Sequence, residues 1–141
     1  MLTFNNLYLK RSSSSLLANS CKAAAVLVDH SDEVQNNIWY FANNFDITHK
    51  IWIELNQFKK DNDVLKQNSL INAIYNDKYN GVEEIDSEVL FKDCLELFDK
   101  HFNESIYYLS LICDKNDEET MSTLDSILNL MKLNLDLNIQ K

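Results

Sequence analysis

The stretch His49–Phe58, HKIWIELNQF, combines charged and aromatic residues at helical spacing and carries a single carboxylate, Glu54. Asp46, Lys50 and Glu54 follow one another at intervals of four. On a helix they would form a solvated ladder of ion pairs, each contributing roughly a few tenths of a kcal/mol. His49 is expected to be a hydrogen-bonded structural histidine, because a lone histidine on a helix is seldom a ligand. The stretch alone therefore indicates a stable helix rather than a catalytic site.

The rest of the chain offers few groups for catalysis. It has no GxSxG motif, its 3 histidines are scattered, and its single glycine cannot form a phosphate-binding loop. Cys21, Cys94 and Cys113 are odd in number and form no CxxC pair, so they are predicted to be buried small apolar residues.

The net charge of -9 argues against nucleic acid as the main partner, because phosphate binding needs clustered Lys and Arg. No apolar run reaches the roughly 18 residues of a transmembrane segment.

Long helices must position these residues. The chain has 141 residues, 45% of them hydrophobic, with 1 Gly and no Pro. Such a length provides one core, and so few helix breakers exclude a turn-rich β fold. The sequence therefore predicts a single all-α domain.

Apolar spacing predicts four long helices and a short one. The first covers Ser13–Val28, and the second begins after a Ser31 cap with Asp32 and Glu33 in its first turn. A loop is predicted over Lys59–Asn68, followed by a short helix over Leu70–Tyr75 and a break at Gly81. A third long helix then begins with Asp86 or Ser87 as its cap. The last helix has a capping-box-like start at Asn116 and Glu119, and its end, Leu133–Ile139, could fray.

Each long helix has a predicted buried face. These positions are Leu16, Leu17, Ala18, Cys21, Ala24, Ala25 and Val28 in the first; Val34, Ile38, Phe41, Phe45, Thr48, Trp52 and Leu55 in the second; Phe91, Leu95, Phe98, Phe102, Ile106, Leu109 and Cys113 in the third; and Met121, Leu124, Leu128, Met131 and Leu135 in the last.

Two strings are more specific than helix patterning. SLLANSCKAAAVL, Ser15–Leu27, and SDEVQNNIWYFANNFDITHKI, Ser31–Ile51, resemble the second half of a trans-polyprenyl diphosphate synthase. More narrowly, they resemble the partner subunit (subunit 2) of the heteromeric decaprenyl diphosphate synthases. The match covers Ser12–Phe58 and fades to helix spacing beyond Leu65. The resemblance implies that residues 1–141 form the C-terminal half of such a domain, a partial isoprenoid-synthase helical bundle.

In the catalytic members of that family this helix carries an FQxxDD motif, whose carboxylates hold Mg²⁺ against the substrate diphosphate. The resemblance puts the Phe-Gln of the motif on His49 and Lys50 and its aspartates on Ile53 and Glu54. A further aspartate falls on Gln57, so one carboxylate of three remains. Mg²⁺ prefers octahedral oxygen coordination, so Glu54 beside Lys50 is not expected to hold it.

The second departure from the family pattern lies before the first helix. Catalytic members carry a Lys-Thr pair that binds diphosphate, and the matching positions here are Ser12 and Ser13, with Lys10 and Arg11 displaced upstream. The first aspartate-rich motif, DDxxD, does not occur in the chain. The resemblance therefore implies neither a catalytic residue nor a bound metal here, with Mg²⁺ held by a catalytic partner.

The implied function is that of a non-catalytic subunit, or a fragment of one, which supports a catalytic polyprenyl diphosphate synthase subunit in making the ubiquinone side chain. Two alternatives stay open: a short-form synthase that acts alone with a degenerate site, and a stand-alone helical interaction module unrelated to isoprenoids.

The resemblance also implies a mitochondrial location. The basic, serine-rich start resembles a transit peptide as well, but a match of Ser13–Val28 to a core helix favours a folded helix. On that interpretation Met1 begins a truncated gene model or a partial paralogue. Half a bundle would expose apolar surface, so the neighbourhoods of Trp39 and Trp52 are expected to contact a partner.

Overall fold

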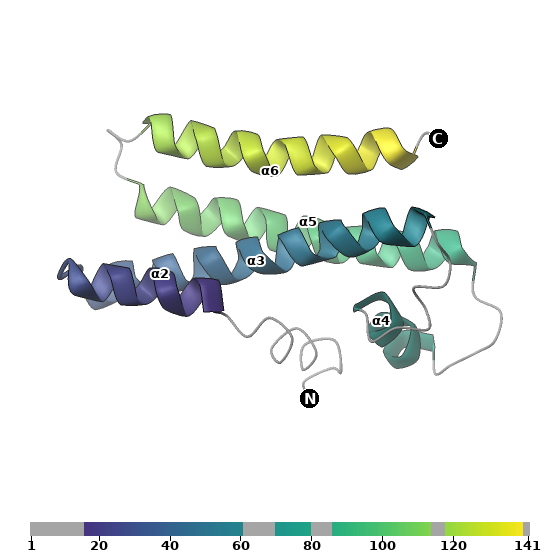
Figure 1. Cartoon of the computed structure of the whole chain (residues 1–141), viewed down its shortest axis with the longest axis horizontal. Helices are drawn as coiled ribbons and strands as arrows, with labels where there is room; N and C mark the ends of the chain where they lie inside the picture. The colour runs from purple at the N-terminus through teal and green to yellow at the C-terminus, as the bar shows by residue number, and fades with distance from the viewer. Residues whose placement is uncertain (1–15, 61–69, 80–85, 114–117, 140–141) are drawn as a thin grey trace.

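The fold is all-α, as predicted. The computed structural model describes residues 16–60, 70–79, 86–113 and 118–139. Helices contain 94% of these residues and strands none of them. They are α2 (Leu16–Leu27), α3 (Asp32–Lys60), α4 (Leu70–Tyr79), α5 (Ser87–Ile112) and α6 (Glu118–Ile139) (Figure 1).

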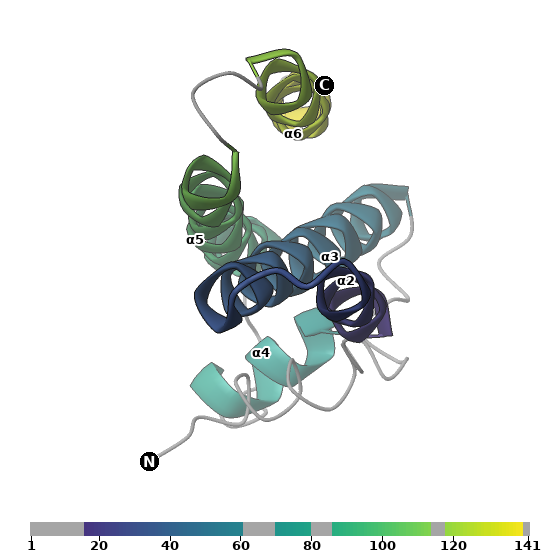
Figure 2. The ribbon, with the colours of Figure 1, turned by 90° about the vertical axis from the view of Figure 1, so that its left-hand side faces the viewer.

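Two long helices, α3 and α5, form the centre of the molecule. They run antiparallel, and α2 folds back along the first half of α3 (Figure 1). α6 and α4 lie on opposite sides of the α3–α5 pair, as both ribbon views show (Figure 2). α6 packs against both central helices, and α4 packs mainly against α5.

Local signals account for the helix ends. Asp29 has a φ of 59°, and the amides of Asp29 and His30 bond back to the carbonyls of Val26 and Ala25. This is a Schellman motif, with aspartate in the left-handed position that glycine usually takes. The Ser31 cap is confirmed, because its hydroxyl accepts a bond from the Val34 amide at 3.4 Å.

The start of α5 is confirmed in the same way. The Asp86 carboxylate accepts a hydrogen bond from the Glu88 amide at 3.0 Å, which makes Asp86 the N-cap.

One continuous core connects α3, α4, α5 and α6, whereas α2 contributes no residue to it. α2 instead buries the small side chains Ala18 and Ala25, which permit a close approach between helices. The buried members of the core are Ile47, Ile51, Leu55, Phe58, Ile74, Leu90, Cys94, Phe98, Phe102, Leu128, Met131 and Leu135.

The predicted buried face of α2 is mostly wrong. Leu16, Leu17, Ala24 and Val28 are exposed and Cys21 is half-buried, while Ala18 and Ala25 are buried as predicted. Among the described helices, α3 is the neighbour of α2 and covers one of its sides, so the predicted apolar stripe, which is broader than that contact, has its outer members exposed.

The predicted face of α3 is rotated from the observed one. Thr48 and Leu55 are buried as predicted, but most other members of that line are half-buried. Asn44 faces α5, whereas Trp39 faces α2, and the predicted line runs between these two sides. The half-buried members are Val34, Ile38, Phe41, Phe45 and Trp52.

In α5 and α6 about half of the predicted positions are correct. Phe98, Phe102, Leu109, Leu128, Met131 and Leu135 are buried as predicted. Phe91, Leu95, Ile106, Cys113, Met121 and Leu124 are half-buried instead.

Some predicted boundaries shift. α3 continues through Lys60, so the loop predicted from Lys59 begins too early, and α4 extends to Tyr79 rather than Tyr75. α6 stays helical to Ile139, through the segment expected to fray. Gly81 and the Asn116 cap lie outside the described residues.

Candidate functional site

The positions matched to the metal motif lie on α3 and point in different directions. Ile53 is 38% exposed, and Gln57, one turn later, is exposed too. Glu54 is half-buried, and its charge contributes to raising the pKa of the Cys94 thiol on α5. Lys50 forms an ion pair with Asp46 at 2.8 Å, as the predicted ladder requires. The remaining carboxylate is therefore less exposed than Ile53 and Gln57 and near enough to α5 for its charge to act on Cys94.

His49 does not have the hydrogen-bonded role predicted for it. The side chain is exposed, and its ring stacks on Trp52 with centroids 5.9 Å apart and an interplanar angle of 27°. Trp52 is half-buried, and its buried Nε1 has no hydrogen-bond partner among the described residues. Among the described residues, His49 therefore makes an aromatic contact in place of the predicted hydrogen bond.

The matched diphosphate positions, Ser12 and Ser13, lie outside the described residues, as do Lys10 and Arg11.

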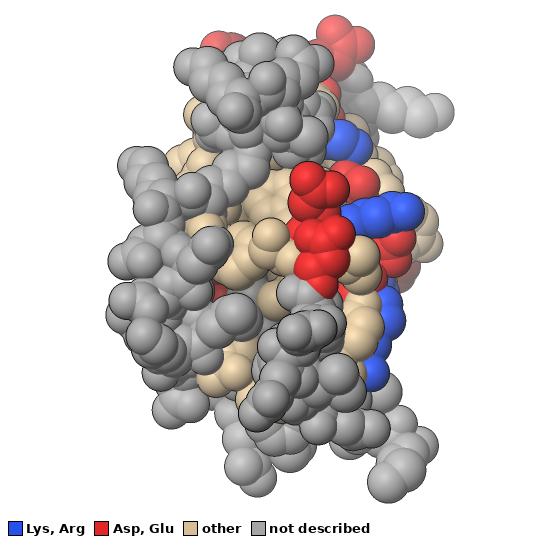
Figure 3. Space-filling model, turned by 90° about the vertical axis from the view of Figure 1, so that its right-hand side faces the viewer, with Lys and Arg blue, Asp and Glu red and all other residues tan. Residues whose placement is uncertain are grey.

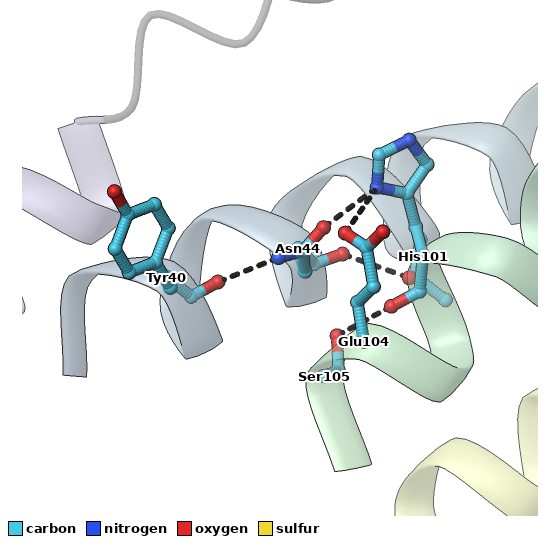
Figure 4. A network of polar contacts seen from close by, with 6 residues as sticks. Tyr40, Asn44, His101, Glu104 and Ser105 are labelled. Carbon is cyan, nitrogen blue, oxygen red and sulfur yellow. Dashed lines mark hydrogen bonds and ion pairs between the residues drawn. The ribbon is translucent and has the colours of Figure 1, made fainter. Parts of the chain in front are cut away.

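Four buried polar side chains occur among the described residues, and Figure 4 shows three of them, Asn44, His101 and Ser105, close together where α3 meets α5. Asn44 and Thr48 belong to α3, and His101 and Ser105 to α5. The Asn44 amide oxygen lies 2.7 Å from Nδ1 of His101, a contact across 57 positions of sequence. We call these four residues the polar layer.

The hydrogen bonds around Asn44 determine the tautomer of His101. Nδ2 of Asn44 donates to the carbonyl of Tyr40 at 2.9 Å, so Oδ1 is the group that faces the imidazole. An amide oxygen only accepts, so Nδ1 of His101 must carry the proton and donate. Burial, with a smaller contribution from the Lys100 charge, lowers the pKa of His101 to about 4. The ring is therefore neutral near pH 7, and its 3.9 Å approach to Glu104 is not then an ion pair.

The two hydroxyls of the layer bond to their own helices. Oγ1 of Thr48 donates to the Asn44 carbonyl at 2.8 Å, and Oγ of Ser105 donates to the His101 carbonyl at 2.9 Å. Each buried polar side chain of the layer therefore has a partner, as buried polar groups require. This arrangement leaves no activated hydroxyl and sets the register of α3 against α5.

The buried thiol of Cys94 is not a nucleophile near neutral pH. Burial, and after it the charge of Glu54, raises the pKa of Cys94 to about 12. The reactive form of cysteine is the thiolate, which this environment suppresses. Cys94 therefore behaves as the small buried apolar residue that the sequence predicted, whereas Cys21 and Cys113 are half-buried, and none of the three forms a disulfide in the described structure.

A second polar cluster joins α4 to α5. The Asp93 carboxylate accepts hydrogen bonds from Lys78 Nζ and the Tyr79 hydroxyl, both at 2.6 Å. Burial alone would raise the pKa of Asp93, but these hydrogen bonds outweigh it and hold that pKa below its ordinary value. The cluster fixes the end of α4 on α5.

The apolar spacing of the sequence did not predict buried positions for Asn44, His101 and Ser105. A usable signal existed: Asn44 with Thr48, and His101 with Ser105, are polar pairs spaced by four inside apolar stripes. Side chains of two such pairs on different helices can hydrogen-bond to each other only if those helices pack together.

The charged surface is mixed rather than acidic throughout. At the end of the molecule opposite the α2–α3 turn, acidic and basic side chains lie side by side next to uncharged surface (Figure 3). Lys132 pairs with Asp99 at 2.9 Å between α6 and α5.

Within the described residues, His, Cys, Asp and Glu form no group of three or more that could hold a metal ion. None of the described helices has the length and apolarity for a bilayer crossing.

Comparison with protein-family models, curated proteins and solved structures finds no match to this chain.

Proposed function

We propose that the chain is a non-catalytic helical subunit, or a fragment of one, that binds the catalytic subunit of a heteromeric trans-polyprenyl diphosphate synthase. The strings Ser15–Leu27 and Ser31–Ile51 are the reason for naming this partner. The same resemblance suggests a mitochondrial location, a role in making the ubiquinone side chain, and Mg²⁺ held by the catalytic subunit.

The observation that carries the proposal is apolar surface on helix sides that face away from the core. α6 buries Leu128 and Met131, yet Leu130 and Leu133, on its other side, are 64% and 53% exposed. A helix with apolar residues on both sides is typical of one that is covered on both sides.

α2 shows the same feature. Leu16 is 75% exposed, Leu27 is 86% exposed and Val28 is 66% exposed, while Ala25 is buried against the rest of the molecule. Contiguous apolar surface on a folded chain usually marks an interface. The outer sides of α2 and α6 are therefore the surfaces that a partner subunit would cover.

The residues at the matched metal positions support a role outside catalysis. Ile53 and Gln57 offer no charged oxygen ligand, and Lys50 brings a positive charge that would repel a divalent cation. We therefore expect no prenyl transfer from isopentenyl and farnesyl diphosphates by the isolated chain with Mg²⁺. Turnover above a no-enzyme control that disappears in Glu54→Ala would contradict the proposal.

Binding tests the proposal directly. The tagged full chain is co-expressed with a catalytic polyprenyl diphosphate synthase subunit, and co-purification is expected. Leu130→Glu should weaken this binding, because it places a charge in the apolar contact, whereas Asn129→Glu, on the neighbouring exposed position, should not. Failure of the wild-type chain to co-purify would count against the proposal.

A stand-alone interaction module is the second candidate, and the continuous core of α3 to α6 favours it. Residues of these four helices bury one another in one cluster. A monodisperse monomer at micromolar concentration with one cooperative melting transition would favour this candidate. Self-association that is relieved by the catalytic subunit would favour the first.

A further inference from the structure

Four aromatic side chains form a row across α3 and α5. Tyr40 and Tyr108 stack with ring centroids 5.0 Å apart and an interplanar angle of 21°. Trp39 meets Tyr40 edge-on at 5.3 Å, and Tyr107 meets Tyr108 edge-on at 5.2 Å. The Trp39 indole also donates to Asn19 of α2 at 2.8 Å, so the row is anchored to three helices. We call these four residues the aromatic row.

Two rings of the aromatic row are open to solvent. Tyr40 is 45% exposed and Tyr107 is 58% exposed, and Leu111, one turn after Tyr107, is 47% exposed. Tyrosines and tryptophans with accessible faces are enriched at the centres of protein interfaces, where they contribute large contact area at low entropic cost. The row therefore has the composition of a binding surface.

Beside the row lies a carboxylate that has no cationic partner among the described residues near pH 7. Glu104 is one turn before Tyr107 and Tyr108 on α5, and its side chain is 43% exposed. Its ionic contact among the described residues is the 3.9 Å approach to His101, whose ring is neutral near pH 7. Burial, followed by the influence of Tyr40 and then Glu104, raises the pKa of Tyr108, which is consistent with a carboxylate close to the rings.

We infer that the aromatic row and Glu104 together bind an arginine side chain of a partner protein. The inference rests on the proposed function in that it requires a partner chain. Arginine fits both elements, because its planar guanidinium stacks on aromatic faces and pairs with a carboxylate in the same pose. The chain's net charge of -9 adds a long-range attraction for a basic partner surface.

Lysine fits less well. Its ammonium is a compact and strongly hydrated charge that does not stack, so it can satisfy Glu104 but uses the ring faces poorly. The arrangement therefore selects arginine over lysine at this surface.

The direct test uses the full chain and a small probe. N-acetyl-arginine amide is titrated while the NMR signals of the Trp39 indole N–H and the tyrosine rings are followed. Its neutral isostere, N-acetyl-citrulline amide, is the matched control. We expect saturable shifts with arginine at millimolar concentrations and none with citrulline. Equal shifts with both probes, or no saturable shift with arginine, would overturn the inference whatever the partner is.

Variants locate the binding. Glu104→Gln and Tyr107→Ala should each weaken arginine binding by roughly three- to fivefold, since each removes one of two modest interactions. Glu96→Gln, an exposed carboxylate elsewhere on α5, should leave it unchanged. A wild-type circular dichroism spectrum for each variant shows that folding is intact. Unchanged affinity in both Glu104→Gln and Tyr107→Ala would contradict the inference.

The partner assay separates this inference from the proposed function. The double variant carries Glu104→Gln and Tyr107→Ala. If the wild-type chain co-purifies with the catalytic subunit and the double variant binds it roughly tenfold more weakly or worse, both the proposed function and the inference stand. If the double variant binds equally well, the inference fails and the proposed function stands. If the wild-type chain does not bind that subunit, the proposed function fails while the arginine titration still decides the inference.

Discussion

The two halves of α3 share one helical pattern of apolar residues but have different neighbours. The first half lies between α2 and α5, where Trp39 meets α2 and Asn44 meets α5, and most of its side chains are half-buried. The second half contains every α3 member of the continuous core and packs there with α4, α5 and α6, while Ile53 and Gln57 on its other side face solvent. α2 has 12 residues and α3 has 29, or about 18 Å against about 44 Å, so the described α2 can cover less than half of α3. Burial along α3 thus differs because different neighbours pack against its two halves.

The largest expected effect contrasts two residues of the second half. Leu55 is 0% exposed and Ile53 is 38% exposed, although they are two positions apart. Leu55→Ala should lower the free energy of unfolding by about 3 to 5 kcal/mol, because it leaves a cavity in the core. Ile53→Ala should lower it by less than about 1 kcal/mol. Urea unfolding measures both, and similar losses for the two variants would mean that the described exposure of Ile53 is wrong.

The next effect concerns pH and the polar layer. His101 has a pKa of about 4 in the folded chain and about 6.5 when unfolded, so the unfolded state binds more protons between these values. Stability is therefore full above about pH 6.5 and falls by up to roughly 3 kcal/mol as the pH drops to 4. His101→Gln keeps a hydrogen-bond donor and does not titrate, so its pH dependence should be weaker.

Unfolding by denaturant at pH 7 and pH 4 measures this difference. The carboxylates are the same in both proteins, so the difference between wild type and His101→Gln isolates the imidazole. Identical pH dependence in the two proteins would show that His101 is not buried as a neutral group.

A smaller effect tests the cross-helix hydrogen bond. Asn44→Ala removes the acceptor for His101 and leaves a buried N–H without a partner, which should cost about 1 to 3 kcal/mol. Asn43→Ala, at a half-buried neighbouring position, is the matched control and should change stability by less than about 0.5 kcal/mol. A double-mutant cycle of Asn44→Ala with His101→Ala should show coupling between the two sites. Additive losses would mean that the hydrogen bond contributes nothing of its own.

The smallest expected effect on stability comes from restoring the family's aspartate spacing in the second half of α3. Ile53→Asp with Gln57→Asp should change the free energy of unfolding by less than about 1 kcal/mol, because both positions are exposed. Ile51→Asp, at a position that is 1% exposed, is the control and should be severely destabilised.

Calorimetric titration of the double variant with Mg²⁺ and a diphosphate analogue should show at most weak binding. Glu54 is half-buried, whereas positions 53 and 57 are exposed, and Lys50, one turn before Glu54, adds a positive charge that repels Mg²⁺. Tight binding that depends on the analogue would require withdrawal of the non-catalytic proposal.

The all-α class, the Ser31 and Asp86 caps and the existence of the described helices could be predicted from the sequence alone. These features depend on local interactions: a capping side chain bonds an amide two or three residues away, and the scarcity of Gly and Pro leaves helices uninterrupted. The residue types at positions 53, 54 and 57 were also evident from the sequence.

The buried side of each helix could not be predicted in this way, because it depends on how the helices pack together. The pairing of Asn44 with His101 across 57 positions depends on the register of α3 against α5, which no local signal contains. Likewise Leu16 and Leu130 have the composition of core residues yet lie in solvent, because the neighbours that would cover them are not provided by the described helices. Helical periodicity shows that a face is apolar, and only the packing of other helices determines whether that face is covered.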